Sequence, residues 1–120
     1  MITSIAYTVY PVTDMAKARG FYETALGLKV THNFKDLWLE YDLGDSTLAI
    51  AGMDMGLSPG AKGAMVALET DDLDGLVKQL KARLVSFAME PFETPVCRMG
   101  IIKDPDGNQL VLHQRHQAGV

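Results

Sequence analysis

The chain has 120 residues, of which 48% are apolar and 22% are charged, and its formal net charge is −4 at pH 7. This length and composition are typical of one folded domain with a buried core, and they exclude an intrinsically disordered chain. The negative charge argues against nucleic acid or an anionic membrane as the main partner, and solubility alone accounts for such mild acidity.

Cysteine content and hydropathy bear on the compartment. The single cysteine, Cys97, excludes an intrachain disulfide, as is common in a reducing compartment. The N-terminus lacks a basic segment followed by a long apolar core, so no signal peptide is evident, and no apolar run approaches membrane-spanning length. We therefore expect a cytoplasmic protein with no membrane partner.

The first half of the chain predicts a strand, a helix and three more strands. Residues 5–12 are apolar and β-branched and predict a strand, after which Asp14 is placed to cap a helix and Gly27 to end it in a left-handed conformation. Strands are predicted over 28–34, 37–43 and 47–51. The predicted helix has an apolar face made of Met15, Ala18, Tyr22, Ala25 and Leu26.

The second half predicts the same order of elements. A strand over 64–69 is followed by Asp71 and Asp72 as candidate helix caps, and strands follow over 85–89, 96–102 and 110–112. Residues 90–95 are predicted to form a loop, a tight Asp-Pro-Asp-Gly-Asn turn lies at 104–108, and residues after Gln114 are predicted to form a polar tail. The helical stripe consists of Leu73, Leu76, Val77, Leu80 and Leu84.

The two halves also align in sequence, residues 6–14 with 64–72 and residues 48–50 with 110–112. The glycine-rich segment 52–63 is then a link between them, and it is the segment that we expect to be most mobile. The predicted fold class is α+β. It consists of two βαβββ modules, at about residues 1–52 and 63–115, each with one helix on the outer side of its strands.

Short motifs at both ends of the chain carry a family resemblance. The Asp-Pro-Asp-Gly-Asn turn, together with Asp14, Phe21-Tyr22-Glu23 and Leu26-Gly27-Leu28, resembles the vicinal-oxygen-chelate (VOC) superfamily. That superfamily includes glyoxalase I, extradiol dioxygenases, and bleomycin- and fosfomycin-resistance proteins. The resemblance spans nearly the whole chain and implies a single domain, a strongly curved eight-stranded mixed sheet with a cleft on the face away from the helices, and a homodimer.

The metal enzymes of this superfamily take four His, Glu or Gln ligands from the first and last strands of each half. Carried over by position, these sites fall at Tyr7, Ala49, Met65 and Val111. None of the four is a good ligand for a divalent ion, and a register shift of one residue gives no better set. We therefore predict no cofactor, with a divalent ion at a displaced site as the less favoured alternative.

The period-two pattern of the strands predicts which side chains line the cleft. They are Tyr7, Val9, Trp38, Glu40, Ala49, Met65, Ala67, Glu69, Val111 and His113. Apolar walls with a few polar groups are typical of small-molecule sites, although packing at a dimer interface explains the same pattern.

Among these residues, Trp38 can stack on an aromatic ligand, and Glu40, Glu69 and His113 are candidate acid–base residues. The competing interpretation of the glutamates is a solvated strand face, and that of His113 is ordinary hydrogen bonding at the end of a strand. His116 is predicted to point to the opposite side from His113, and His32 to be isolated.

Arg98 is a candidate to bind an anionic ligand, and Cys97 is predicted to be buried and inert. The pattern leaves open which of the two neighbours faces the cleft, because both alternating sets of this strand are apolar. No glycine-rich phosphate loop and no Ser-His-Asp arrangement is evident in the sequence.

The sequence thus favours a metal-independent, glyoxalase/bleomycin-resistance-like protein that binds an apolar or aromatic small molecule. The predicted ligand-binding residues are Tyr7, Trp38, Glu40, Met65, Arg98, Val111 and His113. The alternative is a glyoxalase- or dioxygenase-type enzyme, a lyase or isomerase, that uses a relocated metal or acid–base chemistry at Glu40, Glu69 and His113. An interaction module without a ligand is a third interpretation.

Overall fold

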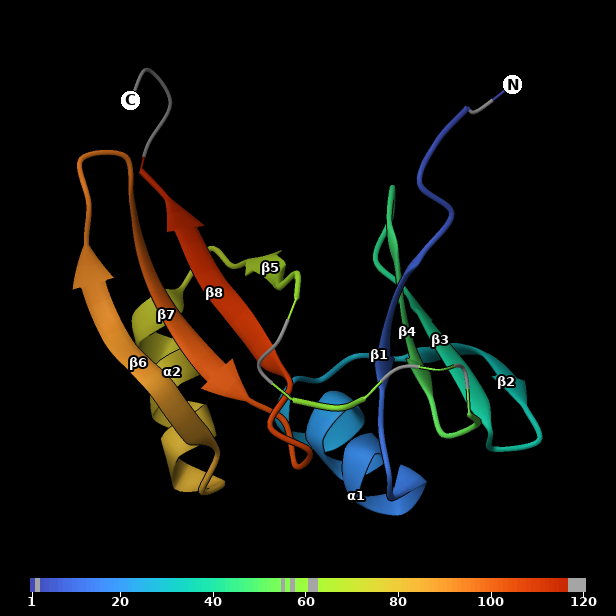
Figure 1. Ribbon diagram of the computed structural model, residues 1–120. Helices are drawn as coiled ribbons and strands as arrows, with labels where there is room; N and C mark the ends of the chain where they lie inside the picture. Colours follow the sequence, from blue (N-terminus) through green and yellow to red (C-terminus); the bar gives the residue numbers. More distant parts are fainter. Residues whose placement is uncertain (2, 55, 57, 61–62, 117–120) are drawn as a thin grey trace. The chain divides into compact units, whose positions relative to one another are not determined.

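The computed structural model describes residues 1, 3–54, 56, 58–60 and 63–116 (Figure 1). The chain divides into two compact units, unit 1 (Met1–Pro59) and unit 2 (Gly60–Val120). The boundary between them falls inside the predicted link. Residues 55, 57, 61 and 62 of that link, which was expected to be mobile, and residues 117–120 of the predicted tail lie outside the described residues.

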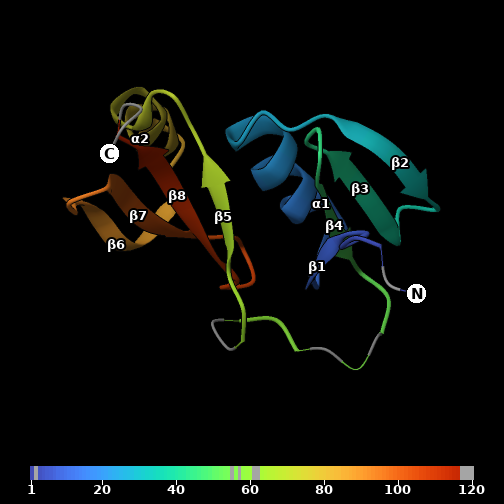
Figure 2. The same ribbon diagram turned by 90° about the horizontal axis from the view of Figure 1, so that it is seen from above.

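Unit 1 is a βαβββ module, as predicted. Its elements are β1 (Thr8–Pro11), α1 (Met15–Arg19), the π-helix η1 (Gly20–Ala25), β2 (Val30–Phe34), β3 (Trp38–Asp42) and β4 (Thr47–Ala51). The strands form one mixed sheet in the order β1-β4-β3-β2, with β1 parallel to β4 and the other pairs antiparallel. The helical segment covers one face of this sheet (Figure 2).

Unit 2 repeats this arrangement. Its elements are β5 (Val66–Glu69), α2 (Leu73–Ala82), β6 (Ser86–Glu93), β7 (Cys97–Lys103) and β8 (Gln109–Arg115). The sheet order is β5-β8-β7-β6, again with one parallel pair, β5 and β8. The α+β class and the two-module organisation are therefore confirmed, with the eight strands forming two four-stranded sheets. The strong curvature that the family resemblance implies stays a prediction.

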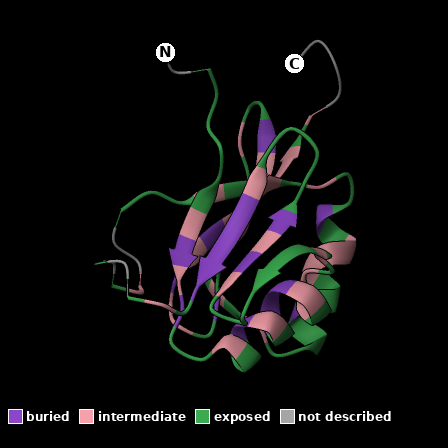
Figure 3. Cartoon of the chain, turned by 90° about the vertical axis from the view of Figure 1, so that its right-hand side faces the viewer, coloured by how far each residue is buried: buried purple, intermediate pink, exposed green. Residues whose placement is uncertain are grey.

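Each unit has its core between its helix and one face of its sheet. In unit 1 the ring of Tyr22 stacks on that of Tyr41, with centroids 5.9 Å apart, and both residues are buried. In unit 2 the buried side chains of Leu73 and Leu80 on α2 lie with Leu112 of β8 in the core. Buried residues are concentrated on the inner strands and on the inward side of the helices (Figure 3). In both units the face of the sheet away from the helix is here called the open face, and it is the candidate functional surface.

The caps and the tight turn predicted from sequence are confirmed. Asp14 accepts the backbone N–H of Lys17, and Asp72 accepts that of Gly75. Gly27 has φ +74, as a left-handed helix end requires. In the turn between β7 and β8, buried Asp104 accepts the backbone N–H groups of Asp106 and Asn108, at 2.9 and 2.8 Å.

Four sequence predictions need correction. The first helix changes to a π-helix from Gly20 onward, which buries the adjacent Phe21 and Tyr22 together. Leu84 lies after α2 with φ +61 and is 90% exposed, so it is not part of the buried stripe. The strand β6 continues through most of the predicted 90–95 loop, because an edge strand with irregular pairing accommodates Pro91. The strand β8 likewise extends past Gln114 to Arg115.

Candidate functional site

The strand register of unit 1 decides which side chains share its open face. Tyr41 points to the helix, since it stacks on Tyr22 and its hydroxyl donates to Glu23 at 3.0 Å. Trp38 and Glu40 alternate with Leu39 and Tyr41 along β3, so they point the other way. Glu40 is directly paired with Ala49 of β4, which is paired with Val9 of β1. The open face of unit 1 therefore carries Val9, Trp38, Glu40 and Ala49, as predicted from period two.

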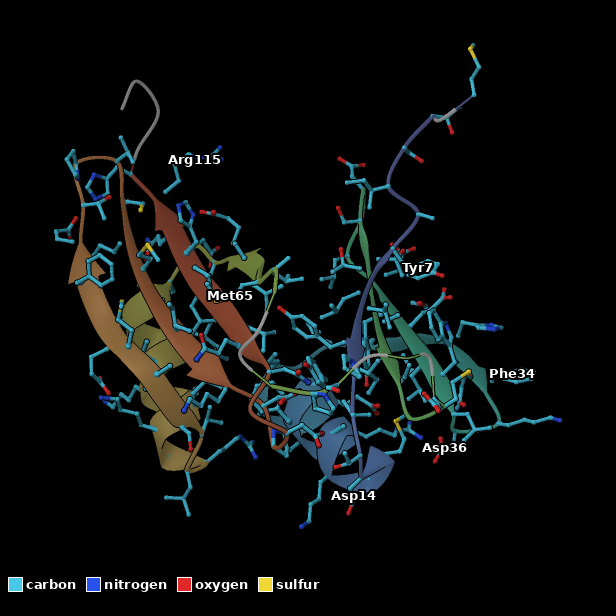
Figure 4. All side chains as sticks on the ribbon, in the orientation of Figure 1. Tyr7, Asp14, Phe34, Asp36, Met65 and Arg115 are labelled. Carbon is cyan, nitrogen blue, oxygen red and sulfur yellow. The ribbon has the colours of Figure 1, made fainter. Side chains whose placement is uncertain are left out.

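Tyr7, just before β1, completes an aromatic corner on this face. Its ring meets that of Trp38 edge to face, with centroids 5.0 Å apart and an interplanar angle of 83°. The indole Nε1–H of Trp38 donates to Oε2 of Glu40 at 2.8 Å. Tyr7 is 43% exposed, and Trp38 and Glu40 are half-buried. Figure 4 shows Tyr7 beside β1. The nearly perpendicular rings of Tyr7 and Trp38 thus lie next to the Glu40 carboxylate, which is hydrogen-bonded to the indole.

The strand β2 adds residues to this face that the sequence did not identify. His32 is paired with Glu40, and Phe34 with Trp38, and directly paired residues of antiparallel strands share a face. Phe34 is 48% exposed, and the Lys35 ammonium lies 5.4 Å from the centre of its ring. The sequence interpretation left His32 isolated because the irregularity between Val30 and His32 shifts the alternation of β2.

In unit 2, three acid–base and polar groups meet at the ends of β5 and β8. His113 Nδ1 lies 2.6 Å from Oε1 of Glu69, and the backbone N–H of Arg115 donates to Oε2 of the same carboxylate at 2.8 Å. The Arg115 amide, followed by the His113 imidazole, lowers the pKa of Glu69 below its ordinary value. An imidazole that donates through Nδ1 carries its lone pair on Nε2, as a general base requires.

The remaining open face of unit 2 is apolar. Val111 is paired with Ala67 and Ile101, and His113 with Met99, so these residues share the face of Glu69. Register also places Met89 and Phe92 of β6 there, at 45% and 39% exposed. The sequence interpretation missed Phe92 because it assigned residue 92 to a loop. Met65, just before β5, is 46% exposed (Figure 4).

Arg98 faces away from the other predicted ligand-binding residues of unit 2 that lie on its strands. It follows Cys97 and precedes Met99 in β7, so it faces the opposite side of the sheet from Met99. Its guanidinium forms ion pairs with Asp74 of α2 and with Glu93. These carboxylates, Asp74 first, raise the pKa of Arg98. Cys97 is buried, as predicted, and lies 3.1 Å from the hydroxyl of Thr94. The question left open by the sequence is thus answered: Arg98 is on the helix side.

The four residues at which the family resemblance places metal ligands do not have the chemistry of a divalent site. Tyr7 and Met65 are both exposed, Val111 is half-buried and Ala49 is buried, and only Tyr7 among them has an oxygen donor. Within the described ranges, no three His, Cys, Asp or Glu side chains form a group that could hold a metal ion.

Comparisons with known proteins agree with this fold. The family profile of the Glyoxalase/Bleomycin resistance protein/Dioxygenase superfamily matches residues 4–112. The chain belongs to this superfamily. No match was found among curated proteins. In the part of the chain that the structure describes, no helix is long and apolar enough to cross a bilayer.

Several solved structures of the superfamily resemble this chain over nearly its whole length. An antibiotic-binding protein, TnmS3, from Streptomyces sp. CB03234 is 29% identical, with a TM-score of 0.82 and coverage of 96% of this chain and 98% of that one. A glyoxalase/bleomycin resistance protein from the same organism is 31% identical, with a TM-score of 0.77 and coverage of 92% and 100%. A superfamily member from Sphaerobacter thermophilus DSM 20745 is 26% identical, with a TM-score of 0.80 and coverage of 95% and 98%.

Proposed function

We propose that this superfamily member is a small-molecule binding protein that holds an apolar or aromatic ligand on its open sheet face without a divalent metal. The observation that carries the proposal is the perpendicular pair of Tyr7 and Trp38 rings next to Glu40. Exposed aromatic faces are stacking surfaces, and a nearby carboxylate fixes the orientation of a ligand. The similarity to an antibiotic-binding protein from Streptomyces supports the same function.

The residues at the metal-ligand positions support the metal-independent part of the proposal. The side chains of Ala49 and Val111 have no donor atom, and the thioether of Met65 is a soft ligand that does not suit a hard ion such as Mn²⁺. Ligand affinity is therefore expected to be the same after dialysis against a chelator and after addition of Zn²⁺, Ni²⁺, Mn²⁺ or Fe²⁺. A rise in affinity with one of these ions would contradict this part of the proposal.

The binding function is tested with the neutral aromatic probe N-phenyl-1-naphthylamine. Trp38 is the only tryptophan, so quenching of protein fluorescence by the probe reports on this residue. We expect saturable quenching. We also expect Tyr7→Ala to weaken binding about two- to twelvefold, because an aromatic pair contributes roughly 0.5–1.5 kcal/mol beyond its buried area. Leu37→Ala is the control, since Leu37 has the same 43% exposure as Tyr7 but lies in the turn after β2. Absence of saturable quenching would refute the proposal.

A second candidate function, an acid–base enzyme of the glyoxalase type, is favoured by one observation in unit 2. The 2.6 Å contact between His113 and Glu69 is a hydrogen-bonded pair of the kind that orients a general base. Its test is turnover of the hemithioacetal of methylglyoxal and glutathione by metal-free protein. If this enzyme interpretation holds, His113→Gln abolishes turnover and His116→Gln, whose imidazole contacts Glu93, retains it. No turnover by the wild-type protein rejects it for this substrate class.

A further inference from the structure

The carboxylate of Glu40 differs from those of all the other glutamates. Glu23 pairs with Arg19, Glu69 with His113, Glu90 with Lys81, and Glu93 with both Arg98 and His116. Within the described part of the chain, Glu40 has no basic partner, and its carboxylate accepts only the indole N–H of Trp38. Glu40 is also half-buried, so its negative charge lacks both full hydration and a counter-ion from the protein.

The aromatic rings beside Glu40 match the chemistry of a cation. The faces of Trp38 and Tyr7 stand at 83° to each other, which makes a corner with two electron-rich surfaces. Such faces attract ammonium groups, and aromatic cages use this attraction to bind organic cations. The hydrogen bond from the Trp38 indole also favours cation binding. It fixes Oε2 of Glu40 and leaves acceptor sites on Oε1 for the N–H groups of an ammonium.

The charges around the corner favour the same kind of ligand. Asp42 lies two residues after Glu40 on the same strand and therefore on the same face, and it is exposed. His32 is paired with Glu40 across the strands, yet no ion pair joins the two side chains within the described residues. Lys35 follows β2, and its ammonium lies over the ring of Phe34, which is paired with Trp38. The two carboxylates of Glu40 and Asp42 thus outnumber the single ammonium of Lys35, which leaves a small excess of negative charge around the corner.

From these observations we infer that the corner formed by Tyr7, Trp38 and Glu40 recognises the protonated amine of an organic cation that carries an apolar or aromatic body. The inference rests on the proposed binding function and adds the charge class of its ligand. The ammonium group lies against the two ring faces and pairs with Glu40, while the apolar body extends over the exposed side chains of the same face. A neutral aromatic molecule of equal size binds more weakly, because it brings no positive charge to pair with the Glu40 carboxylate.

The test compares benzylamine with benzyl alcohol, which is nearly the same size. In a buffer of about pH 7.5 the amine is protonated and positively charged, whereas the alcohol is neutral. The single indole of Trp38 gives one assigned side-chain peak in a ¹H–¹⁵N spectrum, and its shift reports binding at the corner. We expect benzylamine to bind wild-type protein about tenfold more tightly than benzyl alcohol, a difference of roughly 1.4 kcal/mol. Glu40→Gln keeps a group that accepts from the indole and removes the charge, so it abolishes this preference. Glu90→Gln makes the same change in an exposed glutamate of unit 2 and keeps the preference.

The outcomes separate this inference from the function on which it rests. Equal affinities for the two probes in wild-type protein, or an unchanged preference in Glu40→Gln, overturn the cation inference. If benzyl alcohol nevertheless shifts the Trp38 peak, aromatic binding stands without a charge preference. If neither probe shifts the peak while N-phenyl-1-naphthylamine quenches Trp38, the cation inference is overturned and the proposed binding of aromatic ligands stands. If no probe acts on Trp38, both proposals fail.

Discussion

The carboxylate of Glu69 has contacts of two kinds, a backbone amide and an imidazole, and its behaviour with pH follows from them. The Arg115 amide and His113 together lower its pKa in the folded protein. An acid whose pKa is lower in the folded state than in the unfolded state stabilises the fold when it is ionised. This contribution is fully present above the ordinary glutamate pKa of about 4.3 and is lost as the pH falls through the lower folded-state pKa.

We therefore predict that Glu69→Gln destabilises the protein at neutral pH and that the difference from wild type shrinks on acidification. The substitution removes the charge that the Arg115 amide and His113 stabilise, and at low pH wild-type Glu69 is itself neutral. Urea unfolding of both proteins at about pH 7 and at about pH 3 measures the difference. A difference of the same size at both values would show that the contacts of Glu69 do not depend on its charge. Because Glu69 is largely exposed, solvent screening keeps the effect small.

Single residues also show where sequence reasoning succeeds. Asp14, Asp72 and Gly27 were predictable because caps and left-handed helix ends depend on local chemistry. Strict alternation placed Glu69 and His113 on one face, but it gave neither their hydrogen bond nor the absence, among the described residues, of a basic partner for Glu40. Those facts depend on which residues are paired across strands, and a single sequence does not encode the pairing in any local pattern.

Among the elements, α2 shows how a correct helix prediction fails at its end. Leu84 continues the apolar spacing of the stripe, but the helix ends at Ala82 and Leu84 has φ +61. A left-handed conformation costs a residue with a side chain roughly 1–2 kcal/mol, and glycine is the usual residue there. With a side chain that is 90% exposed, Leu84 gains almost no burial in return.

We accordingly predict that Leu84→Gly stabilises the protein by about 0.5–1 kcal/mol, since relief of the left-handed strain exceeds the larger entropy of glycine in the unfolded chain. Leu80→Ala, in the buried part of the same helix, should destabilise it by about 2–5 kcal/mol. Thermal and urea unfolding of the two variants test this contrast. A loss of stability in Leu84→Gly would mean that the leucine side chain has a stabilising contact.

The strand β6 illustrates a different limit of prediction. Two prolines in 90–95 indicated a loop, yet Pro91 lies within β6, which is the edge strand of its sheet. An edge strand has one side without a strand partner, so a missing N–H is tolerated there. Whether a strand is at an edge is a property of the complete sheet. The sequence could therefore indicate the four strands of this half but not the length of the outermost one.

For the molecule as a whole, the repeat was the most informative feature of the sequence. The order strand, helix and three strands recurs in both units, and each unit has its own buried core. The alignment of 6–14 with 64–72 detected this because the same strand-aspartate-helix signal occurs twice. The family match over residues 4–112 agrees with it. Ligand identity was not predictable, because a fold of this kind supports several chemistries, and the residues at the expected metal-ligand positions give no way to choose among them.

We propose that two copies of the chain associate through exposed apolar side chains. On the open face of unit 2, Met89 and Phe92 are 45% and 39% exposed. Side chains of this size exposed together on one sheet face are typical of a surface that a partner covers, and a second copy of the same chain is the commonest partner of this kind. We choose a second copy of this chain as the partner because homodimers are the commonest assemblies and because the superfamily resemblance implies a homodimer.

We expect wild-type protein to sediment at about twice the mass of one chain at concentrations of roughly 10–100 μM. Phe92→Glu should shift it toward the single-chain mass, because a buried charge without a partner costs several kcal/mol at an interface. Leu84→Glu is the matched control: Leu84 is more exposed than Phe92 but follows α2 rather than lying on the open face. Sedimentation of wild-type protein as a single chain would refute the dimer, and a monomeric Leu84→Glu variant would move the interface away from the open face. If Phe92→Glu is monomeric and still binds N-phenyl-1-naphthylamine at Trp38, the open face of unit 1 binds its ligand without the second copy.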